Sequence, residues 1–294
     1  MVSLKTIAER CGVSTATVSK ALNDHKDISE ETKNRVKQTA QTLGYFPNAA
    51  ARALKTNRSY NIGVLFEEEA GRGLTHEYFS GVLNGLKIQA EKLRYDITFI
   101  NTCFENRKMS YYEHCRYRNF EGVVIVCANF DDPDVIELMN SEIPVVTIDY
   151  VHHNCTAVTS NNIQGMEDLV KYIYSQGHRK IAYIHGQEGS SVTRDRLASF
   201  YRTIDELGLE IPDTYVRSAD YLETKGSAKQ TKELLNLEDP PTCIIYPDDT
   251  SLIGGRNVII EMGLRIPRDI SVAGYDGTMI SQLLYPKLTT IRQN

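Results

Sequence analysis

The first 46 residues carry apolar side chains at the spacing of short amphipathic helices. A first stripe, with members three and four positions apart, consists of Leu4, Ile7, Ala8 and Cys11. Gly12 permits the tight turn that ends this helix, and Ser14 is placed to cap a second helix over TATVSKALN. Ser29 opens a third helix. Its apolar stripe consists of Val36, Ala40 and Leu43. The pattern predicts a small three-helix unit.

Beyond residue 60 the pattern changes to short β-branched apolar runs, separated by stretches long enough for a helix. The runs are 62–66, 96–100, 122–126, 144–148, 180–184, 242–246 and 270–275. Strands that alternate with helices favour βαβ units and a largely parallel sheet. Because this number of units exceeds the width of one compact sheet, we predict an α/β body of two doubly wound parallel-sheet subdomains, with a junction near Ser160–Asn162.

Charge divides the chain at the same place. Residues 1–60 hold ten Lys and Arg and five Asp and Glu, which gives this segment a net charge of +5. Because the whole chain has a net charge of −5, residues 61–294 have a net charge of −10. A basic N-terminal unit attached to an acidic body indicates that the N-terminal unit binds a polyanion. A solvated basic surface without a partner is the alternative interpretation of charge alone.

The segment from Ile7 to Asn23 has the pattern of a helix-turn-helix DNA reader. It consists of an amphipathic helix, a turn with glycine, and a second helix with small polar residues at its amino end. In the major groove Thr15 and Ala16 would meet base edges, and Lys20 would reach a guanine or a phosphate. The predicted phosphate contacts are Ser14, Thr17 and Ser19. A helical hairpin without a ligand is the competing interpretation.

Residues 4–60 resemble the DNA-binding headpiece of the lactose/galactose repressor (LacI/GalR) family, through the pattern IAxxxGVSxxTVSxxLN and the segment LGYFPNAAARALKT. The likeness continues through GHRKIAYIHG (177–186), DDTSLIGG (248–255) and SVAGYDG (271–277). The resemblance implies a body like that of the periplasmic binding proteins. It further implies a homodimer that binds a near-palindromic operator in double-stranded DNA, with a sugar or another small metabolite as effector.

The Ala-rich segment from Asn48 to Lys55 is too short for a stable isolated helix, because nucleation is unfavourable and few hydrogen bonds follow it. We expect it to fold only on docking. In the family, the matching hinge helices pair in the minor groove, where a leucine wedges a base step. The resemblance implies that Leu54 is this leucine and that Asn48 and Arg52 are further DNA contacts. An ordinary linker helix is the alternative.

The effector site is expected at the carboxyl ends of the strands, where doubly wound folds bind ligands. Arg196 resembles the family arginine that binds ligand hydroxyls or a carboxylate, and Asp276 resembles the late aspartate that accepts from sugar hydroxyls. A structural salt bridge is the alternative for both. Asp149 and Asp248 are weaker candidates, the second standing where the family usually has Asn.

Three aromatic residues match family positions that contact a sugar ring. They are Tyr78, Phe79 and Tyr221. An aromatic face offers a pyranose contact area without a hydrogen-bonding demand. Packing in the hydrophobic core is the rival role for each of them.

The resemblance divides the chain into four parts. They are a helix-turn-helix DNA-binding domain at 1–46, a hinge helix and linker at 47–60, and two effector-binding subdomains at 61–160 and 161–294. Family members usually continue beyond the position of Asn294, so we expect the C-terminal end of the second subdomain to be truncated.

Signatures of other functional classes are missing from the sequence. It has no GxxxxGK[ST] loop, no GxSxG elbow and no HExxH pair, and we predict no catalytic residue, metal or cofactor. An N-terminus without an apolar signal core, and six Cys without a CxxC pair, favour a cytoplasmic chain with reduced, mostly buried thiols. The prediction is a sequence-specific repressor of carbohydrate-utilisation genes. The alternatives are a cytoplasmic sugar sensor that no longer binds DNA and, with least support, an enzyme.

Overall fold

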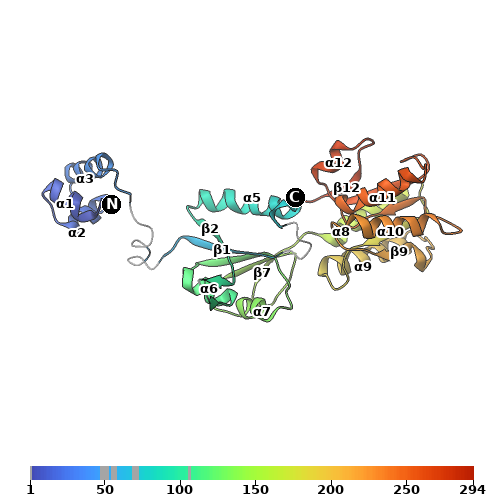
Figure 1. Ribbon diagram of the computed structural model, residues 1–294, viewed down its shortest axis with the longest axis horizontal. Coiled ribbons are helices and arrows are strands. Elements are labelled where there is room, and N and C mark those ends of the chain that lie inside the picture. The colour runs from blue at the N-terminus through green and yellow to red at the C-terminus, as the bar shows by residue number, and fades with distance from the viewer. Residues whose placement is uncertain (1, 47–52, 54–57, 68–72, 105–106) are drawn as a thin grey trace. The chain divides into compact units, whose positions relative to one another are not determined.

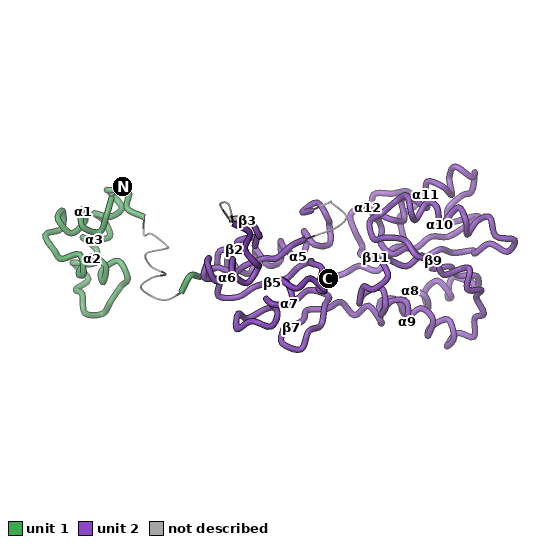
Figure 2. Tube along the Cα trace, turned by 60° about the horizontal axis from the view of Figure 1, so that its bottom comes forward, with its two compact units in different colours: residues 1–60 green, residues 61–294 purple. Residues whose placement is uncertain are grey.

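A computed structural model describes residues 2–46, 53, 58–67, 73–104 and 107–294 (Figure 1). The chain forms two compact units, Met1–Tyr60 and Asn61–Asn294, which Figure 2 colours separately. We call them the headpiece and the body and describe each by itself.

The headpiece contains three short helices: α1 Leu4–Cys11, α2 Thr15–Leu22 and α3 Glu30–Thr42. Each begins at a serine, Ser3, Ser14 or Ser29, whose side chain accepts a backbone N–H of the first turn. Gly12 ends α1 in the left-handed conformation with φ 63°. The core consists of Ile7, Ala8, Cys11, Val18, Ala21, Val36 and Ala40. These helices and their caps confirm the pattern predicted from the sequence.

The body contains a first sheet with the strand order β2-β1-β5-β6-β7, in which every neighbouring pair is parallel. Its strands are β1 Asn61–Phe66, β2 Asp96–Phe99, β5 Gly122–Cys127, β6 Val145–Ile148 and β7 Thr156–Val158. In Figure 1, α5 Glu77–Lys92 lies on one face, and α6 Tyr111–Arg118 and α7 Pro133–Met139 lie on the other. A one-turn helix, Gly73–Thr75, precedes α5, and a small antiparallel pair, β3 Cys103–Phe104 and β4 Arg107–Lys108, precedes α6.

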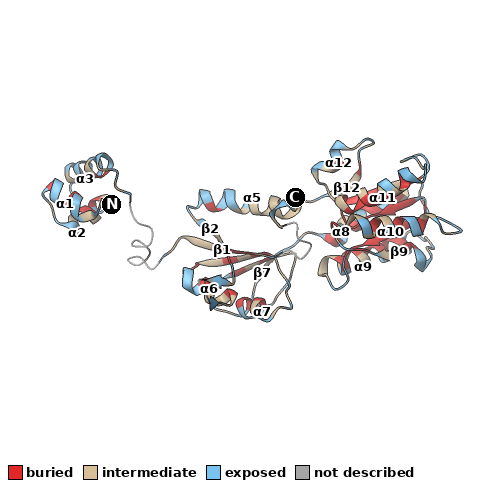
Figure 3. Cartoon of the chain, in the orientation of Figure 1, coloured by how far each residue is buried: buried red, intermediate tan, exposed pale blue. Residues whose placement is uncertain are grey.

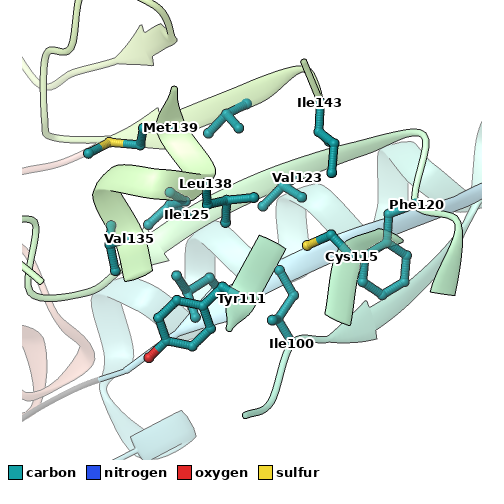
Figure 4. Packing of buried hydrophobic residues seen from close by; sticks show 12 residues of the cluster. Ile100, Tyr111, Cys115, Phe120, Val123, Ile125, Val135, Leu138, Met139 and Ile143 are labelled. Atoms are coloured by element: carbon teal, nitrogen blue, oxygen red, sulfur yellow. The ribbon is translucent and has the colours of Figure 1, made fainter. Parts of the chain in front are cut away.

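Apolar side chains of the first sheet pack against α6 and α7 (Figure 4). Val123 and Ile125 of β5 lie near Leu138 and Met139 of α7. Val145 of β6 belongs to the same cluster. Burial of these side chains fixes the sheet to its helices and so positions the loops at the strand ends.

A second sheet has the order β12-β11-β10-β8-β9, again with parallel neighbours. Its strands are β8 Ile181–His185, β9 Val216–Ser218, β10 Cys243–Ile245, β11 Ser271–Asp276 and β12 Thr289–Arg292. Its helices are α8 Asn162–Ser175, α9 Ser191–Glu206, α10 Thr224–Leu235, α11 Asp249–Glu261 and α12 Met279–Leu283, with a short 3-10 turn at Asp213–Tyr215. Buried side chains line both faces, which Figure 3 shows as red strands between red helix faces.

Both sheets have the same connectivity, because the second strand of each lies outside the first and the later strands continue on the other side. The first strands, β1 and β8, are therefore the points where the chain changes direction. Ligands of doubly wound folds bind at the carboxyl ends of the strands at such points. The two parallel sheets confirm the α/β body, and the strand ends define where its site is expected.

Candidate DNA interface and effector site

The amino end of α2 presents small polar side chains. The Ser14 Oγ accepts the Thr17 N–H at 3.1 Å, and the two hydroxyl oxygens lie 2.9 Å apart. Thr15 and Ala16, the next residues after the cap, are exposed. A helix amino end favours a phosphate, and an exposed hydroxyl and methyl suit base edges.

The carboxyl end of α2 carries Ser19 and Lys20. The Ser19 side chain is half-buried, and its carbonyl accepts the Asn23 side-chain amide at 2.7 Å. The Lys20 Nζ donates to Asp27 Oδ2 at 2.5 Å. The cation predicted to reach DNA is therefore already in an ion pair within the headpiece. Asn48, Arg52 and Leu54, the predicted hinge contacts, lie outside the described residues.

The candidate effector residues all follow strands of the two sheets. Tyr78 and Phe79 lie in α5 after β1, and Asp149 directly follows β6. Arg196 lies in α9 after β8, Tyr221 follows β9, Asp248 follows β10, and Asp276 ends β11. The candidate residues therefore follow the carboxyl ends of strands, which is the edge where doubly wound folds bind ligands.

Arg196 is a buried cation with 3% of its surface exposed. Its Nε donates to Asn162 Oδ1 at 2.8 Å, and one terminal nitrogen donates to the Pro247 carbonyl at 3.0 Å. The guanidinium carbon lies 3.5 Å from the centroid of the Tyr275 ring, a cation–π contact. These contacts fix the orientation of the guanidinium.

Asp276 lies opposite Arg196, with a carboxylate oxygen 3.8 Å from the second terminal nitrogen. Gln293 Nε2 donates to the same oxygen at 2.7 Å. Burial raises the pKa of Asp276 to about 6, although Arg196 acts in the opposite direction. A separation of 3.8 Å exceeds a hydrogen bond. A ligand hydroxyl placed at both groups can accept from Arg196 and donate to Asp276.

Asp149 links Tyr78 to the second sheet's helices. The Tyr78 hydroxyl donates to Asp149 Oδ2 at 2.5 Å, and the Ser160 N–H donates to Oδ1 at 2.9 Å. Burial and the nearby Asp149 raise the pKa of Tyr78, so its hydroxyl stays protonated and donates. The Ser191 hydroxyl, at the start of α9, donates to the Asp149 carbonyl at 2.9 Å.

The two remaining aromatic candidates have packing partners. The ring centroid of Phe79 lies 4.4 Å from that of His76 and 5.5 Å from that of Phe66. The Tyr221 hydroxyl lies 2.8 Å from Thr193 Oγ1, and its ring covers Gly186 so closely that a Cβ there would fall 2.1 Å from Tyr221 Cζ. Both side chains are thus held in place at the strand ends.

Asp248 has a structural role in the fold. It is 1% exposed and caps α11, where Oδ1 accepts the Ser251 N–H at 2.8 Å. Its Oδ2 accepts the Ser251 hydroxyl at 2.7 Å and the Leu222 N–H at 2.8 Å. Both oxygens therefore have donors inside the chain, which reduces their capacity to accept from a ligand.

Sequence reasoning missed Tyr275, Asn162 and Gln293, which surround the Arg196–Asp276 pair. Tyr275 directly precedes Asp276 in the segment SVAGYDG, and Asn162 lies at the predicted junction between the subdomains. The sequence therefore marked both segments but did not mark these two residues as neighbours of Arg196. No local pattern marks Gln293.

A cavity of about 470 Å³ opens beside the amino end of α9. It shares Thr193 with the Tyr221 contact and is also lined by His185, Ser190 and Arg194. Within the described ranges, no helix is long and apolar enough to cross a membrane. Across the same residues, no group of three or more His, Cys, Asp or Glu is arranged to hold a metal ion. Cys11, Cys115 and Cys243 are buried, and all six thiols are free.

Two protein-family descriptions match the chain. "Bacterial regulatory proteins, lacI family" matches residues 3–48, and "Periplasmic binding protein-like domain" matches residues 170–294. The chain therefore has a DNA-binding domain of the LacI family and a periplasmic-binding-protein-like domain. Its relatives include the HTH-type transcriptional repressor PurR of Aliivibrio salmonicida, 28% identical over 100% of this chain and 87% of the relative. The probable HTH-type transcriptional repressor ExuR of Bacillus subtilis is 29% identical over the same shares.

The fold is similar to that of the lac repressor dimer bound to operator and the anti-inducer ONPF, with a TM-score of 0.83 and 26% identity over 100% of this chain and 88% of that one. The regulator CelR in complex with cellobiose shares the fold at a TM-score of 0.68 and 23% identity, with coverage of 100% and 88%. The chain is a transcriptional regulator with a LacI-family DNA-binding headpiece and a metabolite-binding body, and these relatives are repressors rather than enzymes.

Proposed function

We propose that the chain is a cytoplasmic homodimeric repressor of carbohydrate-utilisation genes, whose affinity for a near-palindromic operator is set by a sugar in the body. The proposal extends the family assignment to particular residues and to a class of effector. It is supported by the likeness to the lac repressor dimer. It is also supported by the exposed polar side chains of α2 and by the Arg196–Asp276 pair in the body.

In the DNA interface, α2 lies in the major groove. Thr15 and Ala16 read base edges, whereas Ser14, Thr17 and Ser19 contact phosphates and set the register. Leu54, with Asn48 and Arg52 beside it, acts at the minor groove as the family resemblance implies.

In the effector site, the observation that carries the proposal is the separation of 3.8 Å between Arg196 and Asp276. Such a donor and acceptor pair suits one hydroxyl of a polyol, which both accepts and donates. Tyr78 and Asp149 offer further polar groups, and Tyr221 and Phe79 offer aromatic faces to a ring. A sugar combines the hydroxyls and the ring that these groups recognise.

Selection of duplexes from a random library by the purified chain, at roughly physiological salt, tests the DNA-binding half of the proposal. We expect enrichment of a near-palindrome. Monosaccharides and disaccharides are then screened for those that change the affinity for the enriched duplex. A sugar that binds the chain without any enriched duplex would instead favour the sugar sensor that no longer binds DNA.

A further inference from the structure

Asp27 lies in the connection between α2 and α3, next to the end of the helix that we place in the major groove. Its carboxylate oxygen lies 2.5 Å from Lys20 Nζ, and the two side chains are 53% and 46% exposed. The ion pair is therefore at the surface of the headpiece. It involves Lys20, the residue that the sequence predicts to contact a guanine or a phosphate.

The connection holds Asp27 in a defined place relative to α2. The Asp24 N–H donates to the Ala21 carbonyl at 3.2 Å, and the His25 N–H donates to the Lys20 carbonyl at 3.1 Å. Ile28, directly after Asp27, packs against the headpiece core. These bonds fix the backbone of the connection and so keep the Asp27 carboxylate within reach of Lys20.

The pair changes what Lys20 offers to DNA. The hydrogen bond from Lys20 lowers the pKa of Asp27, which is therefore ionised at neutral pH. Non-specific binding depends on the number of cations that neutralise phosphates, and a paired lysine neutralises fewer. An ammonium has three donors, however, so one can stay on Asp27 while the other two reach the O6 and N7 acceptors of a guanine.

We propose that Asp27 is a specificity-determining residue of the DNA interface, which withholds the Lys20 ammonium from phosphates and holds it for a base edge. This inference rests on the DNA-reading role proposed for α2. Asp27 acts through Lys20 and is a positioning residue.

The test compares D27N with D24N. Asp24 is also exposed and also forms an ion pair, with Lys37 of α3, so both variants remove one negative charge and release one headpiece lysine. Affinities for the enriched operator and for a scrambled duplex of the same composition are measured over a range of salt concentrations. We expect D27N to bind the scrambled duplex more tightly, with a slope of log K against log salt steeper by about 0.9. Its operator preference should fall by about 5- to 10-fold, whereas D24N should keep the wild-type preference.

A second comparison is made in the K20A background, where D27N and D24N should have equal effects. D27S repeats the test if D27N does not fold. If D27N and D24N change operator preference equally with Lys20 present, only net charge matters and Asp27 has no special role. A wild-type chain that enriches no operator would contradict the proposed function itself, which is a different result from equal effects of the two variants on an enriched operator.

Discussion

Asp276 is held in an unfavourable state by its surroundings. Its φ of 95° lies in the left-handed region, which is uncommon for a residue with a side chain, and burial raises the pKa of its carboxyl to about 6. In the unfolded chain this group has the ordinary Asp value. The native state therefore binds the proton more tightly, and stability falls as pH rises from about 4 to about 6. At neutral pH the ionised carboxylate costs about 3 kcal/mol of stability.

The D276N variant tests this cost. Because Asn resembles the protonated acid, we expect it to raise the free energy of unfolding at pH 7 by about 2 kcal/mol and to have little effect near pH 4. Urea unfolding at both pH values measures the difference. D269N is the matched control, since Arg265 lowers the pKa of Asp269 to about 2 and its removal should act with the opposite sign. A D276N variant less stable than the wild type at pH 7 would show that its ion pair with Arg196 outweighs its burial.

The residue types at the candidate effector site were predictable, but the partner of each residue was not. Arg196 and Asp276 were selected by their motifs and do face each other across 3.8 Å. Asp248 was selected for the same reason, yet its oxygens accept from Ser251 and Leu222. A carboxylate that caps a helix and one that faces a ligand look alike in sequence, because the difference depends on residues distant in the chain.

At the scale of elements, the end of β8 depends on a close approach between Gly186 and Tyr221. A Cβ at Gly186 would overlap the Tyr221 ring, so G186A must displace it and should lower the free energy of unfolding by about 1–3 kcal/mol. Urea unfolding provides the measurement. The control is G85A in α5, where a Cβ meets nothing within 4 Å and the better helix propensity should add up to about 1 kcal/mol. Equal stability of G186A and the wild type would mean that Tyr221 moves aside freely.

The seven apolar runs of the sequence correspond to β1, β2, β5, β6, β8, β10 and β11. Apolar runs of five or six residues marked β1, β5 and β11 to within one residue, because both faces of these strands are covered. The strands β7 and β9 have three residues each and lie at sheet edges, and their composition does not distinguish them from loops. The apolar runs therefore predict the edge strand β2 as well as the central strands, and they miss the three-residue edge strands β7 and β9.

At the scale of the whole molecule, the headpiece and the body are separate compact units, so DNA and effector bind to different parts of the chain. If Leu54 acts at the minor groove as proposed, L54A should weaken operator binding about 10-fold or more and leave the sugar affinity unchanged. Operator binding and sugar titration on the same preparation measure both. Equal losses of the two affinities would point to unfolding of the body rather than to the hinge.

Coupling between the two sites must also be reciprocal. If saturating sugar changes the affinity for operator by a given factor, saturating operator changes the affinity for sugar by the same factor, because both measure one coupling free energy. Operator binding with and without sugar, and sugar titration with and without operator, give the two factors.

D276N lacks the ionised acceptor of the proposed effector site. In the absence of sugar we expect D276N to bind operator with the wild-type affinity, and we expect added sugar to leave that affinity unchanged. D269N should respond to sugar as the wild type does. If D276N alone shifted operator affinity as far as saturating sugar shifts that of the wild type, Asp276 would itself set the equilibrium between the two states, and the sugar would act through its hydrogen bond to that carboxylate.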